Sequence, residues 1–139
     1  MSRLKLMLAA FILTGVFVQS ALALTCPQAK DLAYSETKGW TLNTADSNWH
    51  IPYVPTELTA DRTLYFFDTW WDVDTYNQRP ICVYSFNLGG LSKEEVDLLY
   101  TNQVAHPDSD DANWYKAYDE ELYICEAQDP NQCVYPNTI

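Results

Sequence analysis

Positive charge is scarce in this chain: 8 Lys and Arg residues stand against 19 Asp and Glu residues, which gives a formal net charge of −11 at pH 7. An acidic surface repels nucleic acid and anionic lipid, so neither is expected as a partner. It attracts cationic proteins, although a plain solvated surface has the same composition. The ten Tyr and five Trp residues make the chain too apolar to remain disordered.

Catalytic motifs are also lacking. The two histidines, His50 and His106, lie in no nucleophile motif, and the chain contains neither G-x-S-x-G nor C-x-x-C. On a strand, Asp72 and Asp74 would lie about 6.6 Å apart, a spacing used by inverting glycosidases, but glycosidase acids normally face each other across a cleft. The acidic run at 108–113 begins like an EF-hand loop and lacks its glycine, which leaves a weak calcium site or a solvated loop. We therefore expect no enzyme activity, no cofactor and no metal.

A long apolar run is present only at the start of the chain. Arg3 and Lys5 precede an apolar stretch over 6–18, and an Ala-Leu-Ala cleavage motif follows, which together predict a signal peptide over 1–23. The stretch of about 13 residues is shorter than the roughly 20 that span a bilayer, so we expect no membrane span after cleavage. The mature domain, 24–139, would be periplasmic or secreted, and loss of the two basic residues would change its charge to −13.

Four cysteines lie in the predicted mature domain, at Cys26, Cys82, Cys125 and Cys133. Export places them in an oxidising compartment, and an even number favours disulfides. Three pairings are possible. We favour Cys125–Cys133, which closes a local loop, and Cys26–Cys82, which ties the N-terminus to a central strand. The spacing disfavours zinc, and Thr25 before Cys26 disfavours a lipid anchor.

Two segments have the pattern of neighbouring β-strands. Residues 63–73 are rich in aromatic and β-branched side chains, and 81–88 resemble them after a polar turn, which predicts a β-hairpin. By alternation along 63–73, the side predicted to face the core consists of Tyr65, Phe67, Thr69, Trp71 and Val73. The opposite side, predicted to meet water in part, consists of Leu64, Phe66, Asp68, Trp70, Asp72 and Asp74.

A helix is predicted over 93–103. Ser92 and Glu95 are placed as a capping box, and apolar residues from Val96 to Val104 follow helical spacing. Shorter strands are expected at 40–42, 49–54, 122–126 and 133–135, the last two forming a C-terminal hairpin, while 114–118 suits a strand or a helical turn. The predicted fold class is α+β: a mainly antiparallel β-sheet with one amphipathic helix, stapled by disulfides. A β-sandwich with a helical insertion is the alternative.

The side of the 63–73 strand that carries Asp68, Trp70, Asp72 and Asp74 is the candidate partner-binding surface. A tryptophan among carboxylates can dock a basic protein or stack on a sugar ring, because aromatic residues anchor interfaces and acidic neighbours steer cations. The alternative is structural, with Trp70 packed under the predicted helix or the N-terminal segment.

Several short motifs resemble one family. The Leu-Thr-Cys-Pro run at 24–27, Lys-Gly-Trp at 38–40 and Cys-Val-Tyr at 82–84 resemble those of small exported proteins of unknown function from intracellular gammaproteobacteria, in particular the EirA group associated with type IV secretion. The resemblance implies a periplasmic protein without enzymatic activity that supports intracellular replication through the secretion machinery.

Two functional hypotheses follow. The first is a non-enzymatic periplasmic interaction protein whose partner is a cationic or membrane-embedded component of a secretion system. The second is an acidic secreted inhibitor or binder of a cationic enzyme such as lysozyme. An enzyme that cleaves cell-wall glycans through carboxylates is disfavoured.

Overall fold

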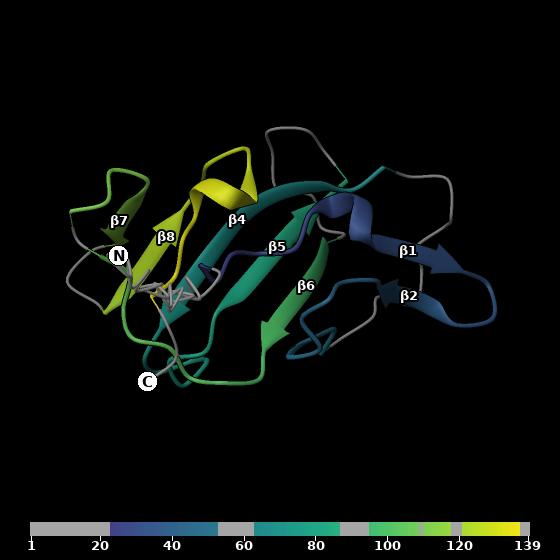
Figure 1. Cartoon of the computed structure of the whole chain (residues 1–139), viewed down its shortest axis with the longest axis horizontal. Helices are drawn as coiled ribbons and strands as arrows, with labels where there is room; N and C mark the ends of the chain where they lie inside the picture. The colour runs from purple at the N-terminus through teal and green to yellow at the C-terminus, as the bar shows by residue number, and fades with distance from the viewer. Residues whose placement is uncertain (1–22, 53–62, 87–94, 109, 118–120, 137–139) are drawn as a thin grey trace, which may run out of the picture.

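Eight short strands form two antiparallel sheets in the computed structural model (Figure 1), which describes residues 23–52, 63–86, 95–108, 110–117 and 121–136. A two-stranded sheet pairs β1 (Leu32–Ser35) with β2 (Gly39–Leu42). The larger sheet has six strands in the order β3-β6-β5-β4-β8-β7. These strands are β3 (Trp49–His50), β4 (Tyr65–Asp72), β5 (Ile81–Ser85), β6 (Glu95–Tyr100), β7 (Trp114–Ala117) and β8 (Leu122–Cys125). Two single 3-10 turns, η1 (Ala29–Asp31) and η2 (Pro130–Gln132), flank them in sequence.

The predicted helix over 93–103 is wrong, and with it the α+β fold class. Residues 95–100 form strand β6, which pairs with β5 from Glu95 to Leu99, and no helix other than the two 3-10 turns occurs in the described ranges. The same apolar residues also fit a period of two, because Val96, Leu98 and Tyr100 alternate with Glu95 and Asp97. Pairing with β5 buries Val96 and Leu98 completely, which outweighs local helix propensity. Ser92 of the capping box lies outside the described residues.

The predicted hairpin of β4 and β5 is confirmed, but the alternation along β4 is interrupted. The register shifts between Phe66 and Asp68, a β-bulge that gives β4 one extra residue. As a result Phe66 packs edge-on against Tyr84 in the core, whereas Tyr65 is 37% exposed. Predicting Tyr65 toward the core and Phe66 away from it was therefore wrong.

Beyond the bulge the predicted core side is confirmed for Thr69 and Trp71, whereas Asp68, which was predicted to meet water in part, is buried. Thr69 and Trp71 are buried on the core side, and Trp71 Nε1 donates a hydrogen bond to the backbone oxygen of Val104 at 2.9 Å. The Thr69 hydroxyl donates to the carbonyl of Ile81 at 2.7 Å and also contacts the hydroxyl of Tyr135. These bonds satisfy polar groups that would otherwise be costly to bury.

One face of the six-stranded sheet is covered by the two ends of the described chain (Figure 1). The N-terminal segment is attached through the Cys26–Cys82 disulfide and through the Tyr84 hydroxyl, which donates to the carbonyl of Pro27 at 2.6 Å. The C-terminal segment crosses the same face, where the backbone N–H of Tyr135 donates to the carbonyl of Leu24 at 2.8 Å. Hence the apolar core lies between the sheet and these two segments.

Both favoured disulfides are confirmed: Cys26 pairs with Cys82, and Cys125 pairs with Cys133. The predicted return strand at 133–135 is wrong, because the chain forms η2 after Asp129 and only Tyr135 makes an isolated bridge, to the N-terminal segment. Disulfides are typical of proteins that fold in an oxidising compartment. None of the helices in the described part of the chain is long and apolar enough to cross a membrane. The predicted signal peptide over 1–23 falls almost entirely outside that part.

Candidate functional site

The second face of the six-stranded sheet, opposite the core, is here called the outer face. Because side chains alternate along a strand, the register assigns its residues to rows across β4, β5 and β6. One row carries Asp68 on β4, Val83 on β5 and Asp97 on β6. Since neighbouring strands lie about 4.8 Å apart, the backbones of Asp68 and Asp97 are about 10 Å apart, on either side of Val83. This row is acidic at both ends and apolar in the middle.

The neighbouring row of the outer face is apolar and aromatic. Cross-strand pairing places Leu99, Ile81, Trp70 and Ile124 side by side, followed by Tyr115 on the edge strand β7. Leu99 and Ile81 are buried, Trp70 and Ile124 are half-buried, and Tyr115 is 46% exposed. His50 on β3 pairs with Leu99 at the opposite edge and is exposed. The outer face therefore combines an acidic row (Asp68, Val83 and Asp97) with this apolar row.

Asp68 is the most unusual residue of the outer face. Its side chain is only 3% exposed, and its Oδ1 atom has no hydrogen-bond partner. Burial, together with smaller contributions from the negative charges of Glu126, Glu95 and Asp97, raises the pKa of Asp68 to about 7. The nearby Trp70 side chain opposes this rise, although Trp70 Nε1 completes no hydrogen bond of normal geometry. Asp68 is thus a buried carboxyl group among like charges.

Asp97 is also an unpartnered acid, but it is less buried than Asp68. Its Oδ1 atom is buried without a hydrogen-bond partner, and the residue as a whole is half-buried. Burial and, to a smaller extent, the charge of Glu95 two residues away on the same strand raise the pKa of Asp97 to about 6. Asp68 and Asp97 on the outer face are therefore both partly removed from water, and each has a carboxyl oxygen without a hydrogen-bond partner to offset that cost.

A third carboxylate adjoins the acidic row on the side of β8. Thr69 pairs with Cys125, so one step further along both strands brings Asp68 beside Glu126, whose charge raises the pKa of Asp68. Glu126 is exposed and accepts a hydrogen bond from the Tyr115 hydroxyl at 2.8 Å. The sequence-based surface omitted Glu126 and Asp97, because it was drawn along one strand.

The other two residues of the predicted surface have a different role. Asp72 closes the end of β4, where its Oδ1 accepts hydrogen bonds from the backbone N–H groups of Asp74 and Thr75 at 2.6 and 2.9 Å. Asp74 lies beyond the strand and is exposed. This is the geometry of an Asx turn. Of the predicted surface, only Asp68 and Trp70 are thus brought together with the acidic row.

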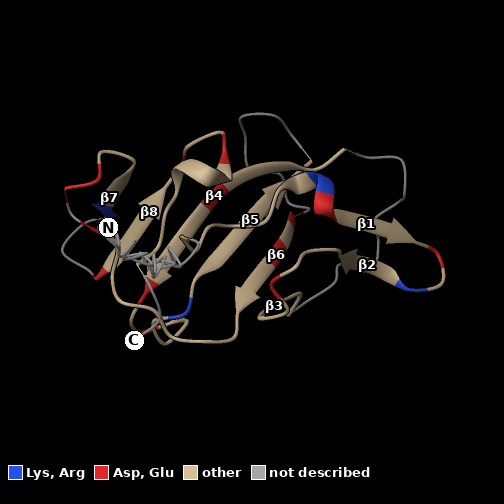
Figure 2. Cartoon of the chain, viewed as in Figure 1, with Lys and Arg blue, Asp and Glu red and all other residues tan. Residues whose placement is uncertain are grey.

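Among the described residues, the Lys and Arg positions lie on η1, in the turn between β1 and β2, before β5 and on β7 (Figure 2). Strands β4, β5, β6 and β8 contain no Lys or Arg. Lys116 on β7 pairs with Tyr123 and hence lies on the core side of the sheet. Lys30 and Lys38 flank β1, and Arg79 donates through Nε to the carbonyl of Tyr76 at 3.1 Å. The carboxylates of the outer face therefore lack a cation from these strands.

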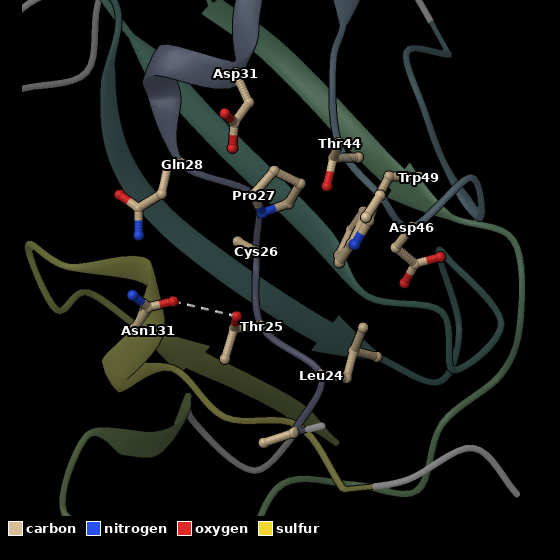
Figure 3. A pocket seen from close by; sticks show the side chains of 12 residues that line it. Leu24, Thr25, Cys26, Pro27, Gln28, Asp31, Thr44, Asp46, Trp49 and Asn131 are labelled. Carbon is tan, nitrogen blue, oxygen red and sulfur yellow. Dashed lines mark hydrogen bonds between the residues drawn. The ribbon is translucent and has the colours of Figure 1, made fainter. Parts of the chain in front are cut away.

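A separate pocket of about 460 Å³ lies beside the N-terminal segment (Figure 3). Gln28 and Asn131 lie on one side of that segment, and Asp46 and Trp49 lie on the other. Thr25 donates to the Asn131 side chain at 3.4 Å, while the Asp46 carboxylate accepts from the backbone and side chain of Asn48 at 3.0 and 2.9 Å. The pocket is open, and Thr25, Asn131, Gln28 and Asp46 already have hydrogen-bond partners within the protein, so these groups do not point to a ligand.

The acidic run at 108–113 forms turns within itself. Asp108 Oδ1 accepts from the N–H of Asp110, and Asp111 Oδ1 accepts from that of Asn113, both at 2.9 Å. Across the described ranges, no cluster of three or more His, Cys, Asp or Glu side chains is arranged to hold a metal ion. No family model, curated protein or solved structure matches this chain.

Proposed function

We propose that this is a non-enzymatic exported protein that binds a cationic protein partner through its outer face. The observation that carries the proposal is Asp68, a carboxyl group that is 3% exposed, has an unpartnered oxygen and lies among other acids. Burying such a group without a cation destabilises the folded state. A residue that reduces stability in this way is more readily understood as part of a binding surface than as part of the scaffold.

The surroundings of Asp68 suit a protein partner. Trp70 is half-buried at the centre of the apolar row, and tryptophan is one of the most frequent anchors of protein interfaces. The exposed Tyr115 and Glu126 lie at its rim. The overall charge of −11 would steer a basic protein toward this surface and raise the rate of association.

The identity of the partner is inferred from the resemblance to the EirA group. We infer a component of a type IV secretion system in the bacterial envelope, reached from the periplasm. The second candidate is a soluble cationic enzyme such as lysozyme, for which this protein would be an acidic inhibitor. Charge complementarity favours both, so the partner itself must be captured.

The experiment is crosslinking in the native envelope followed by affinity purification and mass spectrometry. Wild type is compared with an outer-face variant, Glu95→Gln/Asp97→Asn, and with a matched control, Asp108→Asn/Asp110→Asn, which removes the same charge from an exposed acidic loop. A partner that is retained by the control and lost by the outer-face variant supports the proposal. Equal capture by all three proteins would contradict it.

A further inference from the structure

We propose that strand β7 binds an extended segment of the partner, which adds to the edge of the six-stranded sheet as a further strand. This inference rests on the proposed function and specifies how the partner is held. Strand β7 is the last in the strand order and lies at one end of the sheet (Figure 1), and among the described strands none pairs with its far side. Its two middle residues, Tyr115 and Lys116, are exposed.

The hydrogen-bond pattern of the sheet determines which backbone groups of β7 point outward. In an antiparallel pair, residues that exchange both backbone hydrogen bonds alternate with residues whose backbone groups point away from the neighbour. The N–H of Tyr100 on β6 donates to the carbonyl of Pro80, and the register carries this alternation across β5, β4 and β8 to β7. Tyr115 therefore bonds to β8, whereas the backbone groups of Trp114 and Lys116 point away from it.

A turn before β7 agrees with this assignment. The N–H of Trp114 donates to the carbonyl of Asp111 at 3.1 Å and hence not to β8. The carbonyl of Trp114 and both backbone groups of Lys116 then point out of the sheet edge. Lys116 can form a doubly hydrogen-bonded pair with a residue of an added strand. An edge of this kind is a template for strand addition, a common mode of peptide recognition.

The two faces of this edge differ in charge. Tyr115 continues the apolar row of the outer face, and its hydroxyl donates to Glu126 at 2.8 Å. A basic residue added beside Tyr115 would therefore lie against an aromatic ring and near a carboxylate. Lys116 lies on the opposite face beside Tyr123, so an acidic residue fits opposite it. The edge thus favours a segment with basic residues at alternate positions and an acidic residue between two of them.

A second copy of this chain suits the edge less well than a basic partner. The symmetric pairing that uses both outward groups of Lys116 places two Lys116 side chains opposite each other, which is destabilising. The symmetric pairing centred on Tyr115 needs the N–H of Trp114, which is already bonded to Asp111. Each copy also has a net charge of −11, which opposes association of two copies. An extended segment of a cationic partner avoids all three costs.

The test is an NMR titration of the ¹⁵N-labelled, disulfide-bonded protein with the capped peptide Val-Thr-Arg-Glu-Arg-Thr-Val, whose Glu is placed opposite Lys116. We expect a saturable shift of the Lys116 amide signal and, at saturation, about tenfold slower exchange of this amide with solvent, because it gains a hydrogen bond. The same peptide with an N-methylated Glu keeps its charge but loses the donor to the Lys116 carbonyl, so it should bind about tenfold more weakly. Equal binding of the two peptides would overturn the inference.

A charge swap tests the register. Lys116→Glu should weaken binding of this peptide about two- to fivefold, and a peptide with Lys in place of Glu should restore it. At about 150 mM NaCl, where long-range attraction is screened, wild type should prefer the Glu peptide although the Lys peptide is more cationic. The opposite preference would indicate plain charge attraction and overturn the inference. Lys38→Glu, the same change in an exposed turn, should behave like wild type, and a well-dispersed spectrum shows that each variant is folded.

Two further outcomes separate strand addition from the proposed function. If the Lys116 amide signal shifts with protein concentration in the absence of peptide, the edge pairs with a second copy and the inference is overturned. If the peptide leaves the signals of β7 unchanged while capture from the envelope still depends on Glu95 and Asp97, strand addition falls and the proposed function stands.

Discussion

Replacing Asp68 by Asn should change how the stability of this protein depends on pH. Asp68 has a pKa of about 7 in the folded protein, against 3.8 for an unperturbed aspartate. At pH values between 3.8 and about 7, Asp68 keeps its proton in the folded protein but has lost it in the unfolded chain. The free energy of unfolding therefore falls as pH rises from about 4 to 7, opposite in sign to the usual effect of a salt-bridged carboxylate.

The magnitude follows from the pKa difference. At roughly 1.4 kcal/mol per unit, a rise from 3.8 to about 7 corresponds to about 4 kcal/mol once the group is fully ionised. Between pH 5 and pH 7 the loss is about 2 kcal/mol, because part of it has occurred below pH 5. Asp97, with a pKa of about 6, contributes in the same direction, although the two effects are coupled and do not add fully.

The assay is urea unfolding of the oxidised protein at pH 5, 6 and 7, followed by tryptophan fluorescence. Asp68→Asn has nearly the same shape and no charge, so it should be more stable than wild type at pH 7 and lose about 2 kcal/mol less between pH 5 and pH 7. Asp74→Asn makes the same charge change at an exposed position and should follow wild type. An unchanged pH dependence in Asp68→Asn would refute the reasoning.

Three further results are expected. Replacing Cys26 and Cys82 by Ser should lower the free energy of unfolding by about 4 kcal/mol. Replacing Cys125 and Cys133 by Ser should lower it by about 2.5 kcal/mol, because this disulfide closes a shorter loop. Urea unfolding measures both changes. Tyr84→Phe removes the hydrogen bond to the Pro27 carbonyl and should cost about 1–3 kcal/mol in the same assay, with a smaller cost arguing that water replaces the hydroxyl. Raising NaCl from about 50 to 500 mM should slow association with the captured partner several-fold in surface plasmon resonance, and an unchanged rate would argue against electrostatic steering.

Much of the sheet could be predicted from the sequence, because its signals are local. The aromatic and β-branched composition of β4 and β5 and the polar turn between them predicted the hairpin. The positions of the cysteines left three disulfide pairings open, and the favoured pairing is the one observed. Strand β6 was mistaken for a helix because Val96, Leu99 and Val104 fit a helical period while Val96, Leu98 and Tyr100 fit a strand, and only pairing with β5 decides between them.

The candidate surface was predicted only in part, since it is assembled across strands. Asp68 and Trp70 share a face because of alternation along β4, which the sequence contains. Asp97 and Glu126 reach the same place through cross-strand register, which depends on the bulge after Phe66 and on strand order. The bulge and the strand order cannot be read from the spacing of acidic residues along the chain. The acidic run at 108–113, the most conspicuous in the sequence, instead forms turns within itself.

The most direct test of the account is the pKa of Asp68 itself, measured from the ¹³C shift of its carboxyl group in an NMR pH titration of the disulfide-bonded protein. The account predicts about 7, because the carboxyl group is buried and the described charged groups around it are all acidic. A value near 3.8 would show that the group is solvated or already paired, and would contradict the proposed binding surface.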